Sequence, residues 1–91
     1  MNGILVSVII PIYNVEEYLE ECLYSVVHQS MEGIQAIMVD DGSLDGSSII
    51  AKKFAEKYEN FEYIRQENGG LGNARNTGIR YARGKYIIFL D

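Results

Sequence analysis

The feature that most constrains the fold is a regular alternation between short apolar runs and segments with helical periodicity. The first run, ILVSVII at residues 4–10, is rich in β-branched residues and does not alternate with polar ones, which is typical of a strand buried on both faces. Three amphipathic segments and three further runs follow it. This order predicts an α/β fold: a three-layer, Rossmann-like parallel sheet of about four strands with three helices and right-handed crossovers.

Turn and capping residues set the expected bounds of these elements. Strands are predicted at residues 4–10, 34–39, 61–65 and 86–90, and helices at residues 15–29, 46–58 and 73–82. Pro11 is expected to end the first strand, because proline has no N–H to donate. Asn14, with Glu17 three residues later, is predicted to cap the first helix. The third strand is shorter and more polar than the others, which places it near an edge of the sheet.

Composition excludes several classes of partner and site. The net charge of the 91 residues is −5 and the basic residues form no long run, so we expect no nucleic acid partner. Cys22 is the single cysteine, which leaves no disulfide framework and no cysteine-based metal site. Its spacing places it on the apolar face of a helix, where we interpret it as a small buried hydrophobe.

The ends of the sequence lead to two further expectations. No signal peptide precedes the first strand, and no apolar run approaches the roughly 20 residues that a membrane helix needs, so we expect a cytoplasmic protein. The last predicted strand delivers a carboxylate, Asp91, to the edge of the sheet where ligands bind. We therefore expect the sequence to be a truncated part of a longer domain.

Polar and aromatic side chains gather where the predicted strands end. Because the carboxyl ends of parallel strands meet at one edge, residues there should lie close together and face a ligand. They include Tyr13, the carboxylates of Asp40, Asp41 and Asp91, a glycine-rich loop at residues 68–72, and Arg75. A ring can stack on a base, carboxylates can accept from base or ribose, and N–H groups and arginine can face phosphates. A carboxylate can also help to hold a divalent metal. This set predicts a nucleotide site.

Each part of this set also has a purely structural interpretation. The turn at residues 41–43 is common in proteins, Tyr13 can simply cover the sheet edge, and Arg75 can be a surface charge. We expect Arg75 in the first turn of a helix, where a cation is disfavoured, and this favours anion binding. The glycine loop at residues 68–72 is neither a P-loop nor a dinucleotide fingerprint. A phosphate-accepting signalling domain is disfavoured, because residues 13–14 lack the acidic pair that it would need after the first strand.

Four sequence blocks together carry a specific resemblance. They are VSVIIPIYN at residues 6–14, VDDGSLDG at 39–46, NGGLGNARNTG at 68–78 and GKYIIFLD at 84–91. In this order and spacing they resemble the amino-terminal half of the family 2 glycosyltransferases of GT-A fold, and the match covers nearly the whole chain. The resemblance implies that residues 1–91 are a truncated GT-A fold that binds a nucleotide sugar. It also implies the strand order 3-2-1-4.

The resemblance implies a role for particular residues as well. The nucleotide-sugar site would comprise Pro11, Tyr13, Asn14, Asp40, Arg75 and Asp91. Tyr13 would pack near the base, and Asp40 would accept a hydrogen bond from the base, commonly uracil. Asp41 is expected to shape the turn instead. Asp91 matches the first aspartate of the family's Asp-x-Asp motif, which contacts the ribose or a metal-bound diphosphate, so it would be an indirect or partial metal ligand.

For the full-length protein, the resemblance implies metal-dependent transfer of a sugar, most commonly from a UDP-sugar, to an acceptor hydroxyl. In inverting members a carboxylate deprotonates the acceptor, and Mn²⁺ or Mg²⁺ stabilises the leaving diphosphate. The second aspartate of the motif and this base are not among the 91 residues, so we expect nucleotide binding without catalysis. The alternative is a non-catalytic nucleotide-binding module. Self-association through exposed apolar surface, and a peripheral position at the inner face of the membrane for the full-length protein, are further expectations.

Overall fold

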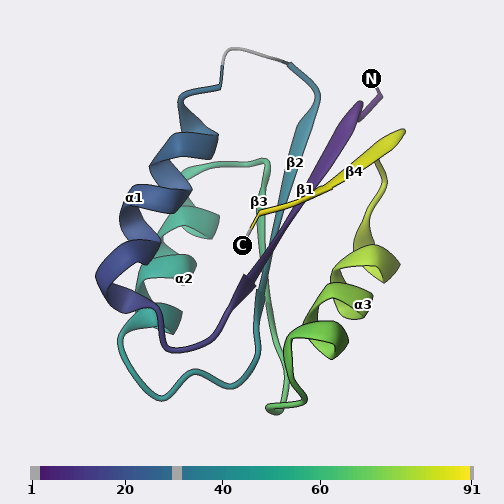
Figure 1. Ribbon diagram of the computed structural model, residues 1–91. Helices are drawn as coiled ribbons and strands as arrows, with labels where there is room; N and C mark the ends of the chain where they lie inside the picture. The colour runs from purple at the N-terminus through teal and green to yellow at the C-terminus, as the bar shows by residue number, and fades with distance from the viewer. Residues whose placement is uncertain (1–2, 30–31, 91) are drawn as a thin grey trace.

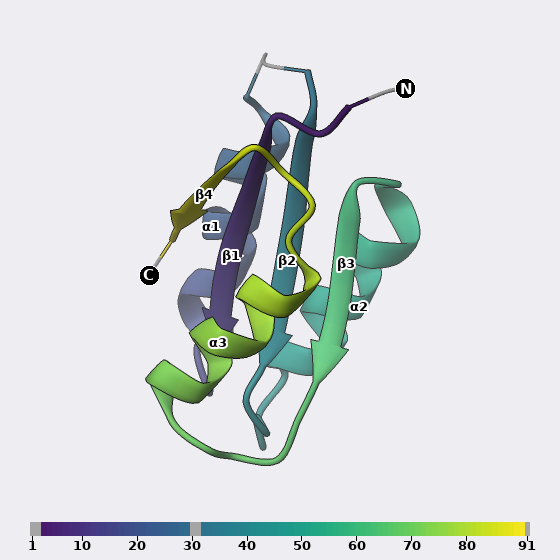
Figure 2. The same cartoon turned by 90° about the vertical axis from the view of Figure 1, so that its right-hand side faces the viewer.

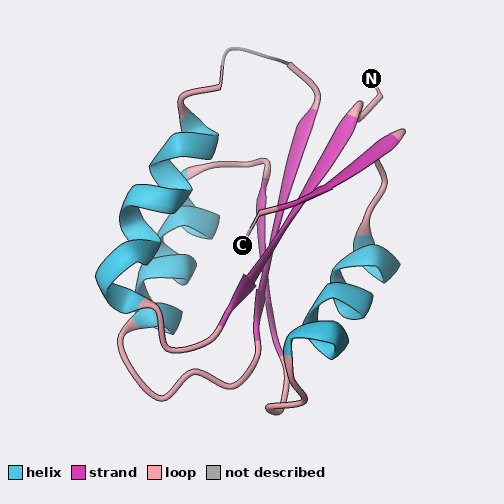
Figure 3. Cartoon of the chain, viewed as in Figure 1, coloured by secondary structure: helices cyan, strands magenta, loops and turns pink. Residues whose placement is uncertain are grey.

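The computed structural model describes residues 3–29 and 32–90. The elements in these ranges are β1 (Val6–Ile12), α1 (Glu16–Val27), β2 (Ile34–Asp40), α2 (Ser47–Lys57), β3 (Phe61–Arg65), α3 (Leu71–Tyr81) and β4 (Tyr86–Phe89). The strands form a parallel sheet in the order β3-β2-β1-β4, which confirms the predicted fold class and strand order. Helices α1 and α2 cover one face and α3 covers the other (Figures 1 and 3). No helix in these ranges combines the length and the apolar character needed to cross a membrane.

The prediction that Pro11 ends the first strand is wrong, because β1 continues through it to Ile12. Pro11 lies two residues after Ile9, so its nitrogen faces the same side as the Ile9 carbonyl, which accepts a hydrogen bond from Leu90 N. The pairing between β1 and β4 has its last pair at Ile9 and Phe89. The missing N–H of Pro11 therefore falls beyond this ladder, where a strand tolerates proline.

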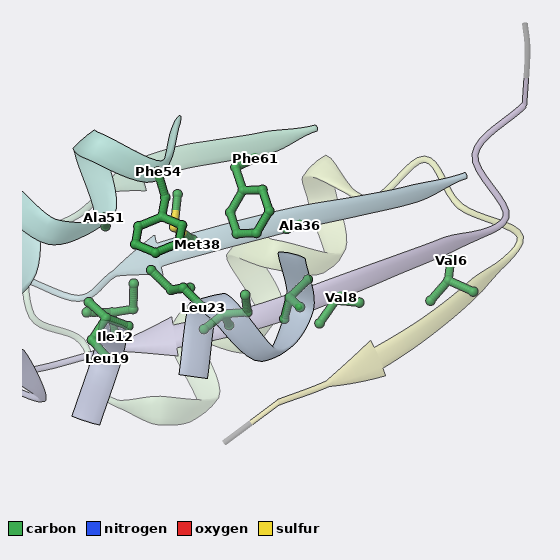
Figure 4. Packing of buried hydrophobic residues seen from close by; sticks show 12 residues of the cluster. Val6, Val8, Ile12, Leu19, Leu23, Ala36, Met38, Ala51, Phe54 and Phe61 are labelled. Atoms are coloured by element: carbon green, nitrogen blue, oxygen red, sulfur yellow. The ribbon is translucent and has the colours of Figure 1, made fainter. Parts of the chain in front are cut away.

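The larger core lies between the sheet and the helices α1 and α2 (Figure 4). Leu23 of α1 is fully buried there, and the ring centroid of Phe54 of α2 lies 5.8 Å from that of Phe61 of β3. Cys22 is partly buried and packs against this cluster. Burial raises the pKa of its thiol, which agrees with a packing role rather than a reactive one.

The opposite face of the sheet is covered by α3, which lies over β1 and β2 (Figure 2). Its contact surface consists of small residues: Ala74 and Gly78 are buried, and a Cβ at Gly78 would overlap the Ile9 side chain. Because Ala74 and Gly78 are four positions apart, they lie on the same face of the helix. The contact of Gly78 with Ile9 sets the distance between α3 and β1. The first residues of α3 border the edge of the sheet that is described below.

Two glycine substitutions within α3 test this contact. Gly78→Ala should lower the free energy of unfolding by about 1–3 kcal/mol, because the added methyl group overpacks against Ile9. Gly72→Ala is the matched control, since a Cβ there meets nothing within 4 Å, and it should leave stability within about 1 kcal/mol of the parent. Urea denaturation of both variants gives the comparison. Equal effects at the two positions would contradict the close approach of Gly78.

Candidate functional site

A cleft of about 490 Å³ lies at the edge where the strands end. It is lined by Pro11, Ile12, Tyr13, Val15, Asp41, Asn68, Gly70, Leu71 and Ala74. These residues come from the end of β1 and the loop after it, the turn after β2, the loop before α3 and the first residues of α3. These loops lie together at the bottom of the view in Figure 1. The volume is in the range of small-molecule sites, and open α/β sheets bind their ligands at this edge.

Of the predicted site residues, Pro11 and Tyr13 lie in the cleft. Tyr13 is 47% exposed, so its ring is accessible to a planar ligand. An exposed aromatic ring offers a flat apolar face, and aromatic pairs favour offset-stacked or edge-to-face contact. The position of Tyr13 is therefore compatible with the predicted packing near a base.

Asn14 has a different local role from the predicted helix cap. The N-cap residue of α1 is Val15, without a side-chain capping bond. Asn14 has a φ of 50°, a conformation that asparagine tolerates better than most residues. Its Oδ1 accepts a hydrogen bond from Leu44 N at 2.8 Å, and its N–H donates to Ser43 Oγ at 3.0 Å. Asn14 thus joins the loop after β1 to the loop after β2.

The beginnings of α1 and α2 cap one another. Val15 N donates to Ser47 Oγ at 3.0 Å and Glu16 N donates to Asp45 Oδ2 at 3.2 Å. In return, Gly46 N donates to Glu16 Oε1 at 3.0 Å. Side chains from one loop therefore satisfy N–H groups at the start of the other helix, which would otherwise lack partners. This reciprocal arrangement fixes the loops that border the cleft.

Asp40, predicted to accept from a base, is fully buried and does not line the cleft. Its Oδ1 accepts from Ser43 N at 2.9 Å, and its Oδ2 accepts from Tyr63 OH at 2.6 Å and Arg65 Nη1 at 3.1 Å. Burial, together with the bond to Asp40, raises the pKa of the Tyr63 hydroxyl. In this arrangement Asp40 connects the turn after β2 to β3.

Asp41, which we expected only to shape the turn, is the carboxylate in the cleft. Its Oδ1 accepts from Gln66 Nε2 at 2.8 Å and Gly69 N at 2.9 Å. Its Oδ2 accepts from Gly70 N at 2.9 Å and Asn68 Nδ2 at 3.2 Å. Burial acts to raise the pKa of Asp41, but the hydrogen bonds from Gln66, Gly69 and Gly70 outweigh it and hold the pKa below its ordinary value. The carboxylate thus holds the glycine loop at the end of β2.

Arg75 does not line the cleft. Helix α3 begins at Leu71, two residues earlier than predicted, so Arg75 is its fifth residue and the expectation of a first-turn position is wrong. The Arg75 guanidinium carbon lies 5.4 Å from the centroid of the Phe89 ring. Asp91 lies outside the described residues. Within residues 3–29 and 32–90, no three acidic, histidine or cysteine side chains form a group that could hold a metal ion.

The sequence profile of "Glycosyl transferase family 2" matches residues 7–91. The chain belongs to this family. Among curated relatives, it is 49% identical over 87 residues to "Uncharacterized glycosyltransferase EpsJ" of Bacillus subtilis, covering 96% of this chain and 25% of that protein. It is 52% identical over 88 residues to "Minor teichoic acid biosynthesis protein GgaB" of the same species, covering 93% of this chain and 10% of that protein. The chain spans a quarter or less of the length of these two relatives.

Solved structures confirm that the fold is of the GT-A type. The structure of S. aureus TarS 1-349 in complex with UDP superposes with a TM-score of 0.88 at 33% identity, covering 96% of this chain and 27% of that chain. The mannosyltransferase PcManGT from Pyrobaculum calidifontis, in complex with GDP-Man and Mn²⁺, gives a TM-score of 0.83 at 27% identity with the same two coverages.

The lowered pKa of Asp41 leads to a pH-dependent prediction. A carboxylate whose folded-state pKa is depressed stabilises the fold above its unfolded-state pKa of about 3.9, and this stabilisation disappears as the pH falls through the lower folded-state value. Asp41→Asn should therefore lower the free energy of unfolding by about 1–3 kcal/mol at pH 7, with a smaller deficit at each step from pH 5 to pH 2. Denaturant unfolding over this range measures the deficit. A deficit that does not change with pH would show that the ionised form is not what stabilises the loop.

Proposed function

We propose that this chain is the donor-binding part of a glycosyltransferase that transfers a sugar from a nucleotide diphosphate to an acceptor hydroxyl. The observation that carries the proposal is the cleft at the strand ends, which combines an accessible ring, Tyr13, with a buried carboxylate, Asp41. Family membership supports the reaction class. The nucleotides in the related structures, UDP and GDP-Man, support a nucleotide sugar as the ligand.

Asp41 is better placed than Asp40 to recognise the base. Uracil and guanine each carry a ring N–H, for which a carboxylate is a strong acceptor. Asp41 already accepts four hydrogen bonds, which is about the capacity of a carboxylate. The base would replace the longest of them, from Asn68 at 3.2 Å. The role predicted for Asp40 would require this fully buried group to give up a bond to Ser43, Tyr63 or Arg65.

The finer chemistry of the transfer is an extension of this proposal. We extend it to an inverting reaction that depends on Mn²⁺ or Mg²⁺, and we assign Asp91 to the metal-bound diphosphate because it matches the first aspartate of the family's Asp-x-Asp motif. The described residues form no metal site by themselves, so we assign no step of the reaction to a cation held here. The chain would bind nucleotide without turnover. Transfer activity in the 91-residue chain would contradict this division of roles.

The base specificity tests the assignment of Asp41. The chain should bind UDP more tightly than CDP, because position N3 of cytosine has no hydrogen to donate to a carboxylate. Asp41→Asn should reduce this preference by about tenfold or more, the usual range for a hydrogen bond to a charged group. Tyr13→Ala should weaken UDP and CDP alike, since every base offers a stacking face. Isothermal titration with both nucleotides measures the affinities.

Two carboxylate variants serve as controls for this titration. Asp45 lies in the same loop as Asp41, but its side chain does not line the cleft. Asp45→Asn should therefore leave the ratio of the UDP and CDP affinities unchanged. Asp40→Asn should weaken both nucleotides equally if it acts only through the turn. If Asp40→Asn abolishes the preference and Asp41→Asn does not, the sequence-based assignment of Asp40 holds and ours is wrong.

Self-association of this chain is a separate proposal, and the exposure of β4 supports it. Tyr86, Ile87, Ile88 and Phe89 are each more than 40% exposed, and β4 is an edge strand of the described sheet. Exposed apolar edge strands are templates for pairing with another chain. Light scattering should show an average mass that rises with concentration, and Ile88→Lys should suppress the rise. Ile49→Lys, at an exposed position on α2, is the control and should not.

A further inference from the structure

The register of β4 cannot be set by its hydrophobic pattern. Its sequence, YIIF, is apolar on both faces, and all four residues are exposed. A slip of the strand by one residue exchanges its two faces and moves the chain by about 3.3 Å. When both faces are apolar, this exchange costs little, so the hydrophobic pattern specifies the register only weakly. Nevertheless β4 pairs with β1 in one register, from Val6 opposite Tyr86 to Ile9 opposite Phe89. Contacts outside the strand must therefore define the register of β4.

Two polar side chains buried in the sheet reach the segment just before β4. Ser7 of β1 and Gln35 of β2 are 0% and 1% exposed, and Ser7 Oγ donates to Gln35 Oε1 at 2.6 Å. Both then accept from the backbone that leads into β4: Gly84 N donates to Ser7 Oγ at 2.8 Å, and Arg83 N donates to Gln35 Oε1 at 2.9 Å. Two consecutive N–H groups are therefore matched to two fixed acceptors.

The other end of the Gln35 amide is also held. Its Nε2 donates to the carbonyl of Tyr81, the last residue of α3, at 3.1 Å, and to Glu62 Oε2 of β3 at 3.0 Å. Glu62 in turn pairs with Arg83 at 2.7 Å. This ion pair is partly exposed and contributes little by itself. Gln35 therefore connects β1, β3, the end of α3 and the entry to β4.

Gly84 adds a steric restriction at the same point. A Cβ at this position would lie 2.6 Å from Ser7 N and 2.9 Å from the carbonyl carbon of Val6. The chain therefore passes directly against the backbone of β1, and in this position only a glycine fits. If the chain slipped by one residue, Arg83 or Lys85 would have to occupy this space.

We propose that Ser7, Gln35 and Gly84 are positioning residues that set the register of β4 and of Leu90, which follows β4 and precedes Asp91 in the sequence. A slip would take the backbone donors Gly84 N and Arg83 N away from the buried oxygens of Ser7 and Gln35, and a lost hydrogen bond is costly in a buried environment. The link to function rests on the proposed donor-binding role, in which Asp91 belongs near the diphosphate. The structural part, the control of register, does not depend on it.

Amide hydrogen exchange of the full 91-residue chain tests the control of register. Gln35→Met removes the hydrogen bonds and nearly keeps the side-chain volume. Exchange at Tyr86 and Leu90, which donate to Leu5 and Ile9 of the β1 side, should accelerate by on the order of tenfold or more. Exchange at Gln66, which donates to the Asp40 carbonyl, should change much less.

A core variant separates positioning from general stability. Phe54→Leu lies in the α2 layer and should accelerate exchange at Gln66 and Leu90 by similar factors. If Gln35→Met also accelerates both alike, or leaves Leu90 unchanged, the proposal is wrong. Ser7→Ala is a milder second variant with the same expected pattern, and it replaces Gln35→Met if that variant does not fold.

A binding measurement then tests the functional link. In the presence of Mn²⁺, the parent should bind UDP more tightly than uridine, and Gln35→Met should reduce this advantage while uridine binding in the Asp41 cleft is kept. An unchanged advantage would overturn the link between the register and Asp91. A parent chain that binds neither uridine nor UDP would contradict the proposed function, and the exchange experiment would still decide the question of register.

Discussion

The arrangement of the ligand edge depends on the hydrogen bonds that the Asp41 carboxylate accepts from residues 66–70. They hold a loop with two consecutive glycines at the end of β2, and this loop leads directly into α3 at Leu71. The position of α3 in turn places Leu71 and Ala74 in the wall of the cleft. One ionised group thus connects the end of β2 to the loop that leads into α3, and with it to one wall of the cleft.

The fold could be predicted from the sequence because its signals are local. β-branched runs and apolar stripes indicate strands and helices within a few residues, and a parallel sheet brings the strand ends to one edge whatever the strand order. The strand order itself came from the family resemblance. The roles of Asp40 and Asp41 could not be separated in this way, because the partners of their carboxylates lie 23 to 29 residues away along the chain, apart from Ser43. Neighbouring residues of an extended chain point to opposite sides, and sequence alone does not say which side faces the cleft.

Ser7 shows a second limit of pattern-based interpretation. In the run ILVSVII it looks like a tolerated small residue, and Gln35 looks like a polar residue near the start of a strand. Their meaning appears only when β1 and β2 are paired, since Ser7 lies directly opposite Gln35 in the sheet. Buried polar pairs of this kind are costly unless every group is satisfied. Here the partners come from the chain segment between α3 and β4, from the last residue of α3 and from Glu62 of β3.

The reciprocal caps at the starts of α1 and α2 have a consequence for how the protein folds. Val15 N and Glu16 N at the start of α1 donate to Ser47 and Asp45, and Gly46 N before α2 donates to Glu16. Ser47 N, by contrast, has a local acceptor, Asp45 Oδ1. Because the first turn is the costly step of helix formation, the two helices should form in one cooperative event. A change of loop length beside one of these helices should therefore also disturb the start of the other.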